Sequence, residues 1–398
     1  MKDKKKKRRR KFPQPEAWLY YPALCLIWLY MKLRYRVTVD RRALRKIKGP
    51  ALILSNHLSN YDHFLLAIAL FPHRPTFVLS AHFMTKRHLR PILNRMHVIT
   101  KRMFDSDAGT VLNMMRAARD GRILVLFPEG RLTWTAHSMR ITEGTADLIG
   151  KLRVPVYRVT PTGAFLTFPK WGRGTRRGKI RIETELMLTA EEAASMSHDE
   201  IYTLISDKLR HDDETACYGI RFRKRATAAG LDGILYHCPA CGHDGTLTAE
   251  KDHISCSACG MEAKLRDDYT FDGAPVATVN EWYRLQYDAL DLGKPLSGDF
   301  NVGAIGEDGY VVKNAGTAHC TLDRDTFTLK GEVFGKQVEF AVPTETIPAV
   351  PITVAHHFDI YHDKTLYHLT PTPDPRVTVR WAIFFDRLTD ERIGHRGK

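Results

Sequence analysis

The sequence predicts an α/β domain with a mixed sheet flanked by helices, followed by two smaller units. Apolar runs alternate with helix-like stretches between residues 36 and 187, two CxxC pairs follow residue 237, and short strand-like segments fill most of the C-terminal part. A length of 398 residues allows two or three domains, and 43% hydrophobic content excludes a disordered chain. We expect units over residues 1–35, 36–228, 229–270 and 271–398.

Buried strands are predicted in the α/β domain where short apolar runs are bounded by turn residues. The strands are expected at 37–39, 51–55, 76–80, 98–100, 123–127, 156–160 and 179–183, and the helices near 62–70, 109–119, 142–152 and 190–210. Open α/β sheets usually bind ligands beyond the strand ends. Polar residues that directly follow these strands are therefore candidates for a functional site.

His57 and Asp62 stand where one predicted strand ends and the next helix begins. Ser59 and Asp62 also fit a capping box, which would start that helix at this point. Across a strand end and a helix start, the two side chains can face each other. A carboxylate bonded to one imidazole nitrogen fixes the tautomer, so the other nitrogen can remove a proton from a hydroxyl. The pair predicts a general base, although a His and an Asp at such a turn are also common without catalysis.

A second apolar run ends in Phe127-Pro128-Glu129-Gly130-Arg131. Pro and Gly stop the strand, while an acid and an Arg follow it closely. These residues have no evident structural purpose at the end of a strand, but they suit a turn that faces a ligand.

Four blocks in order resemble the glycerolipid acyltransferase superfamily, of the 1-acylglycerol-3-phosphate acyltransferase type, over residues 15 to 215. Residues 57–62 match its H-x4-D block, 98–102 its second block, 127–131 its F-P-E-G block and 154–157 its V-P-V block. The resemblance implies that His57 is the general base and that Asp62 orients it. It also implies an acceptor head-group site lined by Arg102, Glu129, Gly130 and Arg131.

The implied reaction moves a fatty acyl group from acyl-CoA or acyl carrier protein to a lysophospholipid hydroxyl. The first acceptor to consider is 1-acyl-sn-glycerol 3-phosphate, which would give phosphatidic acid without any catalytic cofactor beyond the donor. The third block departs from the usual E-G-T-R, because Arg131 follows Gly130 directly. This resembles a branch in which some members use lysophospholipids with a head group, so the acceptor stays open between these two classes.

The N-terminal tail carries nine positive and one negative side chains over residues 2–11, about half of the net charge of +15. A basic run of this kind suits nucleic acid, an anionic membrane or plain solvation. The apolar, aromatic stretch at 17–31 favours a membrane, but it is shorter than the ~20 residues of a spanning helix. We expect a monotopic or peripheral element at the cytoplasmic face of the cell membrane, with a buried core helix as the alternative.

The two CxxC pairs are fourteen residues apart, and a glycine follows each pair. Four thiolates at this spacing predict a closed, structural zinc ribbon, with disulfides as the alternative. The expected ligands are Cys238, Cys241, Cys256 and Cys259.

Beyond a predicted helix at 281–290, alternating segments are expected at 310–312, 318–322, 326–330, 338–342, 358–361, 366–370 and 377–379. A closing helix is expected at 381–388. Seven strands and a helix loosely resemble a pleckstrin-homology-like barrel.

Two other function classes compete with the acyltransferase. A basic zinc-ribbon protein that binds nucleic acid would explain the tail and the pI near 9.5. It gives no role to residues 127–131, so no nucleic-acid partner is expected. An inactive lipid-binding scaffold is disfavoured by the presence of both His57 and Asp62.

Overall fold

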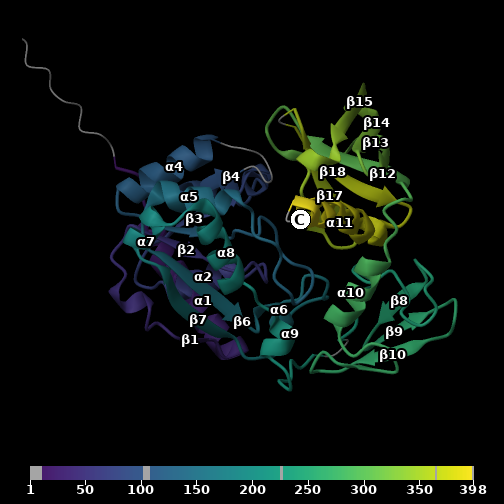
Figure 1. The fold of residues 1–398 in the computed structure, drawn as a ribbon, viewed down its shortest axis with the longest axis horizontal. Helices are drawn as coiled ribbons and strands as arrows, with labels where there is room; N and C mark the ends of the chain where they lie inside the picture. Colours follow the sequence, from purple (N-terminus) through teal and green to yellow (C-terminus); the bar gives the residue numbers. More distant parts are fainter. Residues whose placement is uncertain (1–10, 102–107, 225–226, 364, 397–398) are drawn as a thin grey trace, which may run out of the picture.

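The computed structural model describes residues 11–101, 108–224, 227–363 and 365–396. Three sheets follow one another along this part of the chain. The α/β unit occupies one side of the molecule, and the cysteine-containing unit and the C-terminal sheet occupy the other (Figure 1).

The α/β unit is built on a seven-stranded sheet in the order β1-β7-β6-β2-β5-β3-β4. Its strands are β1 (Thr38–Val39), β2 (Ala51–Leu54), β3 (Thr76–Ser80), β4 (Ile99–Lys101), β5 (Ile123–Leu126), β6 (Val156–Thr162) and β7 (Arg181–Leu188). β2 is parallel to β5 and β6, while β6 and β7 are antiparallel. The mixed sheet predicted from the sequence is therefore confirmed.

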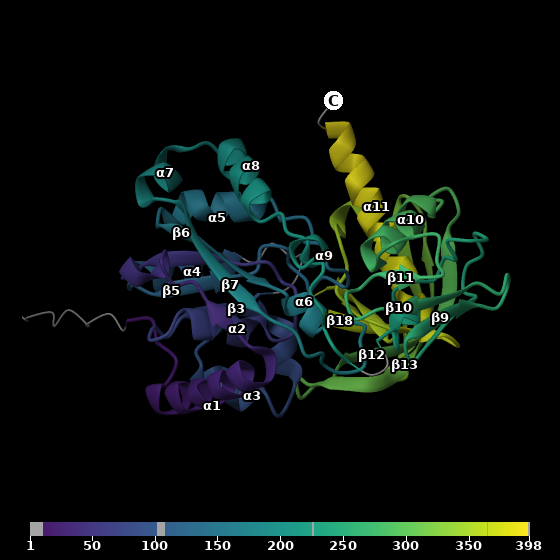
Figure 2. The same cartoon turned by 90° about the horizontal axis from the view of Figure 1, so that it is seen from below.

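Helices cover both faces of this sheet. α1 (Ala17–Tyr35) and α2 (Asp62–Ala69) share a core cluster with Ile53 and Val125. α4 (Ala108–Arg119), α5 (Gly144–Leu152) and α8 (His198–Lys208) share another with Leu52 and Leu124. Because successive strand residues point to opposite faces, β2 and β5 need apolar side chains at every position. Figure 2 shows α1 and α5 on opposite sides of the strands.

The stretch at 190–210 forms two helices rather than the single helix predicted. α7 (Ala190–Ser195) ends before α8, and each helix begins with its own capping box. Ser197 accepts a hydrogen bond from the backbone of Glu200, whose side chain bonds back to Ser197. This S-x-x-E signal was present in the sequence and marks a new helix start.

The four-cysteine unit contains an antiparallel sheet in the order β11-β10-β9-β8. Its strands are β8 (Leu247–Glu250), β9 (His253–Cys256), β10 (Glu262–Leu265) and β11 (Phe271–Asp272). The predicted helix follows as α10 (Val279–Ala289), which begins after its cap Thr278.

The C-terminal unit is a seven-stranded sheet in the order β15-β14-β13-β12-β18-β17-β16, followed by α11 (Thr378–Arg396). The strands are β12 (Leu296–Ile305), β13 (Val311–Leu322), β14 (Thr326–Val333), β15 (Lys336–Pro343), β16 (Ile352–Thr353), β17 (His357–His362) and β18 (Thr365–Thr372). Seven strands and a helix were predicted, but the predicted strands are not the same seven as the observed ones. β12 and β16 were missed, 310–312 and 318–322 belong largely to one strand, and 377–379 lies where the chain enters α11. The likeness to a pleckstrin-homology barrel stays a prediction.

Candidate active site

His57 and Asp62 face each other at the end of β2. The Nδ1 atom of His57 lies 3.0 Å from Oδ2 of Asp62. Asp62 is fully buried and also accepts hydrogen bonds from the backbone N–H of Ser59 at 2.8 Å and from its hydroxyl at 2.5 Å. The carboxylate is thus fixed from three sides, and it holds one imidazole nitrogen. Proton transfer by this ring therefore falls to Nε2.

Phe127 packs flat against the His57 ring, with centroids 4.2 Å apart and an angle of 21° between the planes. Phe127 directly follows β5, which is the neighbour of β2 in the sheet. The stacking supports one face of the ring, and only 18% of the His57 side chain is exposed. A single rotamer of the imidazole is thereby favoured.

Glu129 is buried and joins the two motif segments. Its Oε1 accepts hydrogen bonds from the backbone N–H of His57 at 3.2 Å and from Asn56 Nδ2 at 3.3 Å, and its Oε2 accepts from the N–H of Met139 at 2.9 Å. Burial raises the pKa of Glu129 to about 7, although these hydrogen bonds oppose the shift. The carboxyl group therefore supports the backbone that carries His57.

Gly130 and Arg131 follow in a turn that changes direction sharply. Gly130 has φ +74°, a conformation that side chains with a Cβ rarely adopt. Arg131 is buried and donates from one guanidinium nitrogen to the carbonyl of Val350 at 3.1 Å and from another to Oδ2 of Asp386 at 2.5 Å. Its guanidinium also lies 4.4 Å from the ring of Trp134. The arginine is thus engaged with the C-terminal unit, and Arg102, the other predicted arginine, lies outside the described residues.

A cavity of about 250 Å³ opens beside His57. His57, Gly130 and Arg131 line it together, which brings three of the predicted site residues to one place. Positive side chains gather there as well: Lys86, Lys101 and Lys170. Burial and, to a smaller extent, the Arg131 charge lower the pKa of Lys170 to about 7, whereas Asp359 raises it. The cavity therefore combines a candidate base with several cationic groups.

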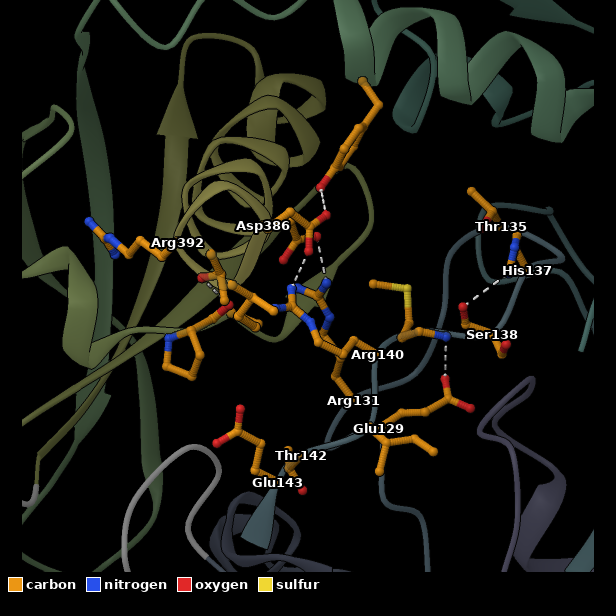
Figure 3. A pocket seen from close by; sticks show the side chains of 18 of the residues that line it. Glu129, Arg131, Thr135, His137, Ser138, Arg140, Thr142, Glu143, Asp386 and Arg392 are labelled. Carbon is orange, nitrogen blue, oxygen red and sulfur yellow. Dashed lines mark hydrogen bonds and ion pairs between the residues drawn. The ribbon is translucent and has the colours of Figure 1, made fainter. Parts of the chain in front are cut away.

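A larger cavity of about 870 Å³ lies between the α/β unit and α11 (Figure 3). Glu129 and Arg131 line it, but His57 does not. Arg140 bonds Asp390 there at 2.5 Å, close to the Arg131–Asp386 pair. We place the reacting groups in the smaller cavity because it contains the imidazole.

The four predicted cysteine ligands converge. Their sulfur atoms lie within 4.8 Å of one another, with 3.8 Å between Cys238 and Cys259 and 3.8 Å between Cys241 and Cys256. A tetrahedral zinc ion with Zn–S bonds of ~2.3 Å needs S···S distances of about 3.8 Å. Glycines 242 and 260 adopt positive φ and donate to the carbonyls of Cys238 and Cys256, as such knuckles require. The four cysteines are free thiols in the structure, and this donor set fits a structural zinc ion.

Comparisons with known proteins find similarity over the α/β unit. Residues 36–160 match the family model described as Acyltransferase. A solved structure, that of the 1-acyl-sn-glycerophosphate (LPA) acyltransferase PlsC from Thermotoga maritima, is 15% identical with a TM-score of 0.41. The match covers 48% of this chain and 78% of that one.

Sequence reasoning missed the contributions of the C-terminal unit to the candidate site. Asp386 and Val350 hold Arg131, and Thr353, His357 and Asp359 line the cavity beside His57. These contacts join segments more than 200 residues apart, and no local pattern announces them. The stacking of Phe127 on His57 would have been easier to predict, because both residues stand at the ends of predicted strands.

Proposed function

We propose that the protein is an O-acyltransferase that moves a fatty acyl group from a thioester of CoA or acyl carrier protein to the free hydroxyl of a lysophospholipid. The 3.0 Å contact between His57 Nδ1 and Asp62 Oδ2, beside a cavity lined with cations, is the observation that carries this proposal. The match of residues 36–160 to the Acyltransferase family model supports the general reaction, and the pair could supply the base that this reaction needs.

In the proposed reaction, Nε2 of His57 takes the proton from the acceptor hydroxyl. The oxygen attacks the thioester carbonyl carbon, a C–O bond forms and the C–S bond breaks. The departing thiolate takes the proton back from His57, so the enzyme ends unchanged. Asp62 accepts the Nδ1–H bond throughout and stabilises the positive imidazole formed midway.

The side chains that line the cavity are suited to bind an acceptor or donor that carries phosphate. Lys86, Lys101 and Lys170 reach the space beside His57, and ammonium groups bind phosphate as compact charges. Arg131, in contrast, already has its carboxylate partner in Asp386. The acceptor phosphate is therefore assigned to the lysines, with 1-acyl-sn-glycerol 3-phosphate as the first acceptor and a head-group lysophospholipid as the alternative.

The proposal also includes association with a membrane surface through α1. Within the described residues, no helix combines the length and apolar character needed to cross a bilayer. α1 buries Leu24 and Met31 against the domain, while Leu26, Leu29 and Leu33 lie 48–76% exposed. An exposed apolar stripe beside basic residues suits insertion into the headgroup region. Aspartate at Leu26 and Leu33 should abolish sedimentation with anionic vesicles, whereas Leu112→Asp on α4, where the leucine is also exposed, should not.

The decisive experiment is a donor-by-acceptor assay of the purified chain. Labelled acyl-CoA and acyl carrier protein are each offered with lysophosphatidic acid and with head-group lysophospholipids. Product is expected from the wild type, and His57→Ala should lower it by at least a factor of ~10². His319→Ala, which removes an exposed histidine from the C-terminal sheet, is the matched control. A folded His57→Ala variant with full activity would disprove the mechanism.

A further inference from the structure

Three metal-binding side chains meet between the α/β unit and the C-terminal sheet, apart from the cysteine cluster. His82 lies in a short helical turn (Ala81–Thr85) that follows β3, Asp359 lies on β17 and His368 on β18. One ligand atom of each residue lies within 4.8 Å of those of the other two. Asp359 and His368 are direct partners in the antiparallel pair β17–β18, so their side chains share a face.

Two buried imidazole nitrogens in this group have no hydrogen-bond partner among the described residues. They are Nδ1 of His82 and Nε2 of His368. His368 is only 6% exposed, and its other nitrogen, Nδ1, lies 2.6 Å from Oδ1 of Asp359. Buried polar atoms rarely lack a partner, so two in one cluster indicate that something else binds there.

The His368–Asp359 arrangement is the one that prepares a histidine for a metal. A carboxylate bonded to one ring N–H fixes the tautomer and leaves the other nitrogen with its lone pair available. The rings of His82 and His368 meet edge to face, with centroids 5.0 Å apart and 75° between the planes.

We infer that His82 and His368 form a binding site for a divalent transition-metal ion, in which Asp359 holds His368 through its other nitrogen. Two imidazole nitrogens are donors suited to Zn²⁺ and related ions, and two protein ligands leave the remaining coordination positions open. His82 and Asp359 also line the cavity that contains His57. The ion would therefore join the C-terminal sheet to the α/β unit at the edge of the candidate active site.

The test is the zinc content of the full-length chain, stripped with a chelator, reloaded with Zn²⁺ and washed. His82→Ala and His368→Ala should each hold one equivalent less than the wild type, whatever the cysteine cluster holds. The same loss from residues of two different units would show that one ion is shared. His319→Ala removes a histidine that bonds Asp299 at 2.7 Å on the same sheet, and it should retain the wild-type content.

Two further measurements keep the result interpretable. Asp359→Asn preserves the shape of the cluster and should weaken zinc binding by roughly 10–100-fold. Loading with Co²⁺ should give the wild type an extra absorption component that lacks thiolate charge-transfer bands, and His368→Ala should lose it. Equal zinc contents and equal cobalt spectra in folded wild type and in both histidine variants would overturn the site and leave bound water as the partner of the two nitrogens.

Discussion

Removing the carboxylate of Asp386 should destabilise the protein strongly, because it would leave the Arg131 guanidinium buried without its charge partner. The two side chains are only 4% and 8% exposed, and their contact is 2.5 Å. After Asp386→Ala, Arg131 would retain the carbonyl of Val350 and the ring of Trp134. Neither group carries a charge. Breaking a buried pair in this way costs about 3–5 kcal/mol in the free energy of unfolding.

The double variant Arg131→Met/Asp386→Leu separates the charge effect from packing. Apolar residues of similar volume remove both charges and their desolvation cost, so the double variant should be close to the wild type or within ~1–2 kcal/mol of it. The coupling energy between the two positions should then be at least ~2 kcal/mol. Arg140→Met is the matched control, since the Arg140–Asp390 pair has the same 2.5 Å distance but exposures of 32% and 52%. It should cost less than about 1 kcal/mol.

Urea titration provides the assay, with tryptophan fluorescence to follow the surroundings of Trp134 and far-UV circular dichroism to follow the whole fold. Changes in the midpoint at constant slope give the differences in unfolding free energy. If Asp386→Ala costs no more than the exposed control, Arg131 is not held by this pair as described. In that case the arginine would be free to bind an acceptor, as the family resemblance implies.

Three further predictions concern the site and the cysteines. Asp62→Asn should reduce kcat roughly 10²–10⁴-fold with little change in KM, as measured in the acyl-transfer assay, because an amide does not fix the productive tautomer. Glu129 has a pKa of about 7 in the folded protein against an ordinary 4.5. Its contribution to the free energy of unfolding should therefore be fully present below pH 4.5 and should be lost as the pH rises through 7, by on the order of 3 kcal/mol. In urea titrations across pH 5–8, Glu129→Gln should abolish this dependence of the unfolding free energy on pH. An unchanged dependence would contradict the prediction. Cys256→Ser should lower metal content and reduce hydrogen-exchange protection of β8–β10, whereas Cys320→Ser, outside the cluster, should leave both unchanged.

The local part of the site could be predicted from the sequence. His57 and Asp62 lie within one strand-to-helix turn, so the end of β2 and the start of α2 place them, and apolar runs mark both elements. The predicted capping box is wrong, because α2 begins after Tyr61 without a side-chain cap and the Ser59 hydroxyl donates to Asp62 instead. A turn was expected after Phe127, and the positive φ of Gly130 agrees with that expectation. The cysteine cluster could be predicted equally well, because the spacing of the four cysteines is a local property of two knuckles.

The remaining features depend on contacts between distant segments. Strand β12 contains Gly298, Asp299, Asn301 and Gly303, which are turn-like residues, and it forms because β13 and β18 pair with it on both sides. Tertiary pairing overrode local propensity there. The position of Glu129 is a similar case. An acid after a strand suggested a ligand-facing group, yet its carboxyl group accepts hydrogen bonds from the backbone of His57 and Met139.

These two observations bear on how the acceptor is chosen. Of the predicted acceptor residues that the structure describes, Glu129 supports the His57 backbone and Arg131 is bound to Asp386 of α11. The cavity beside His57 is completed instead by lysines of the α/β unit and by Thr353, His357 and Asp359 of the C-terminal sheet. Since discrimination between acceptors requires contact with the head group, exchanges in that sheet should alter the acceptor preference. Exchanges at His57 should alter the rate with every acceptor.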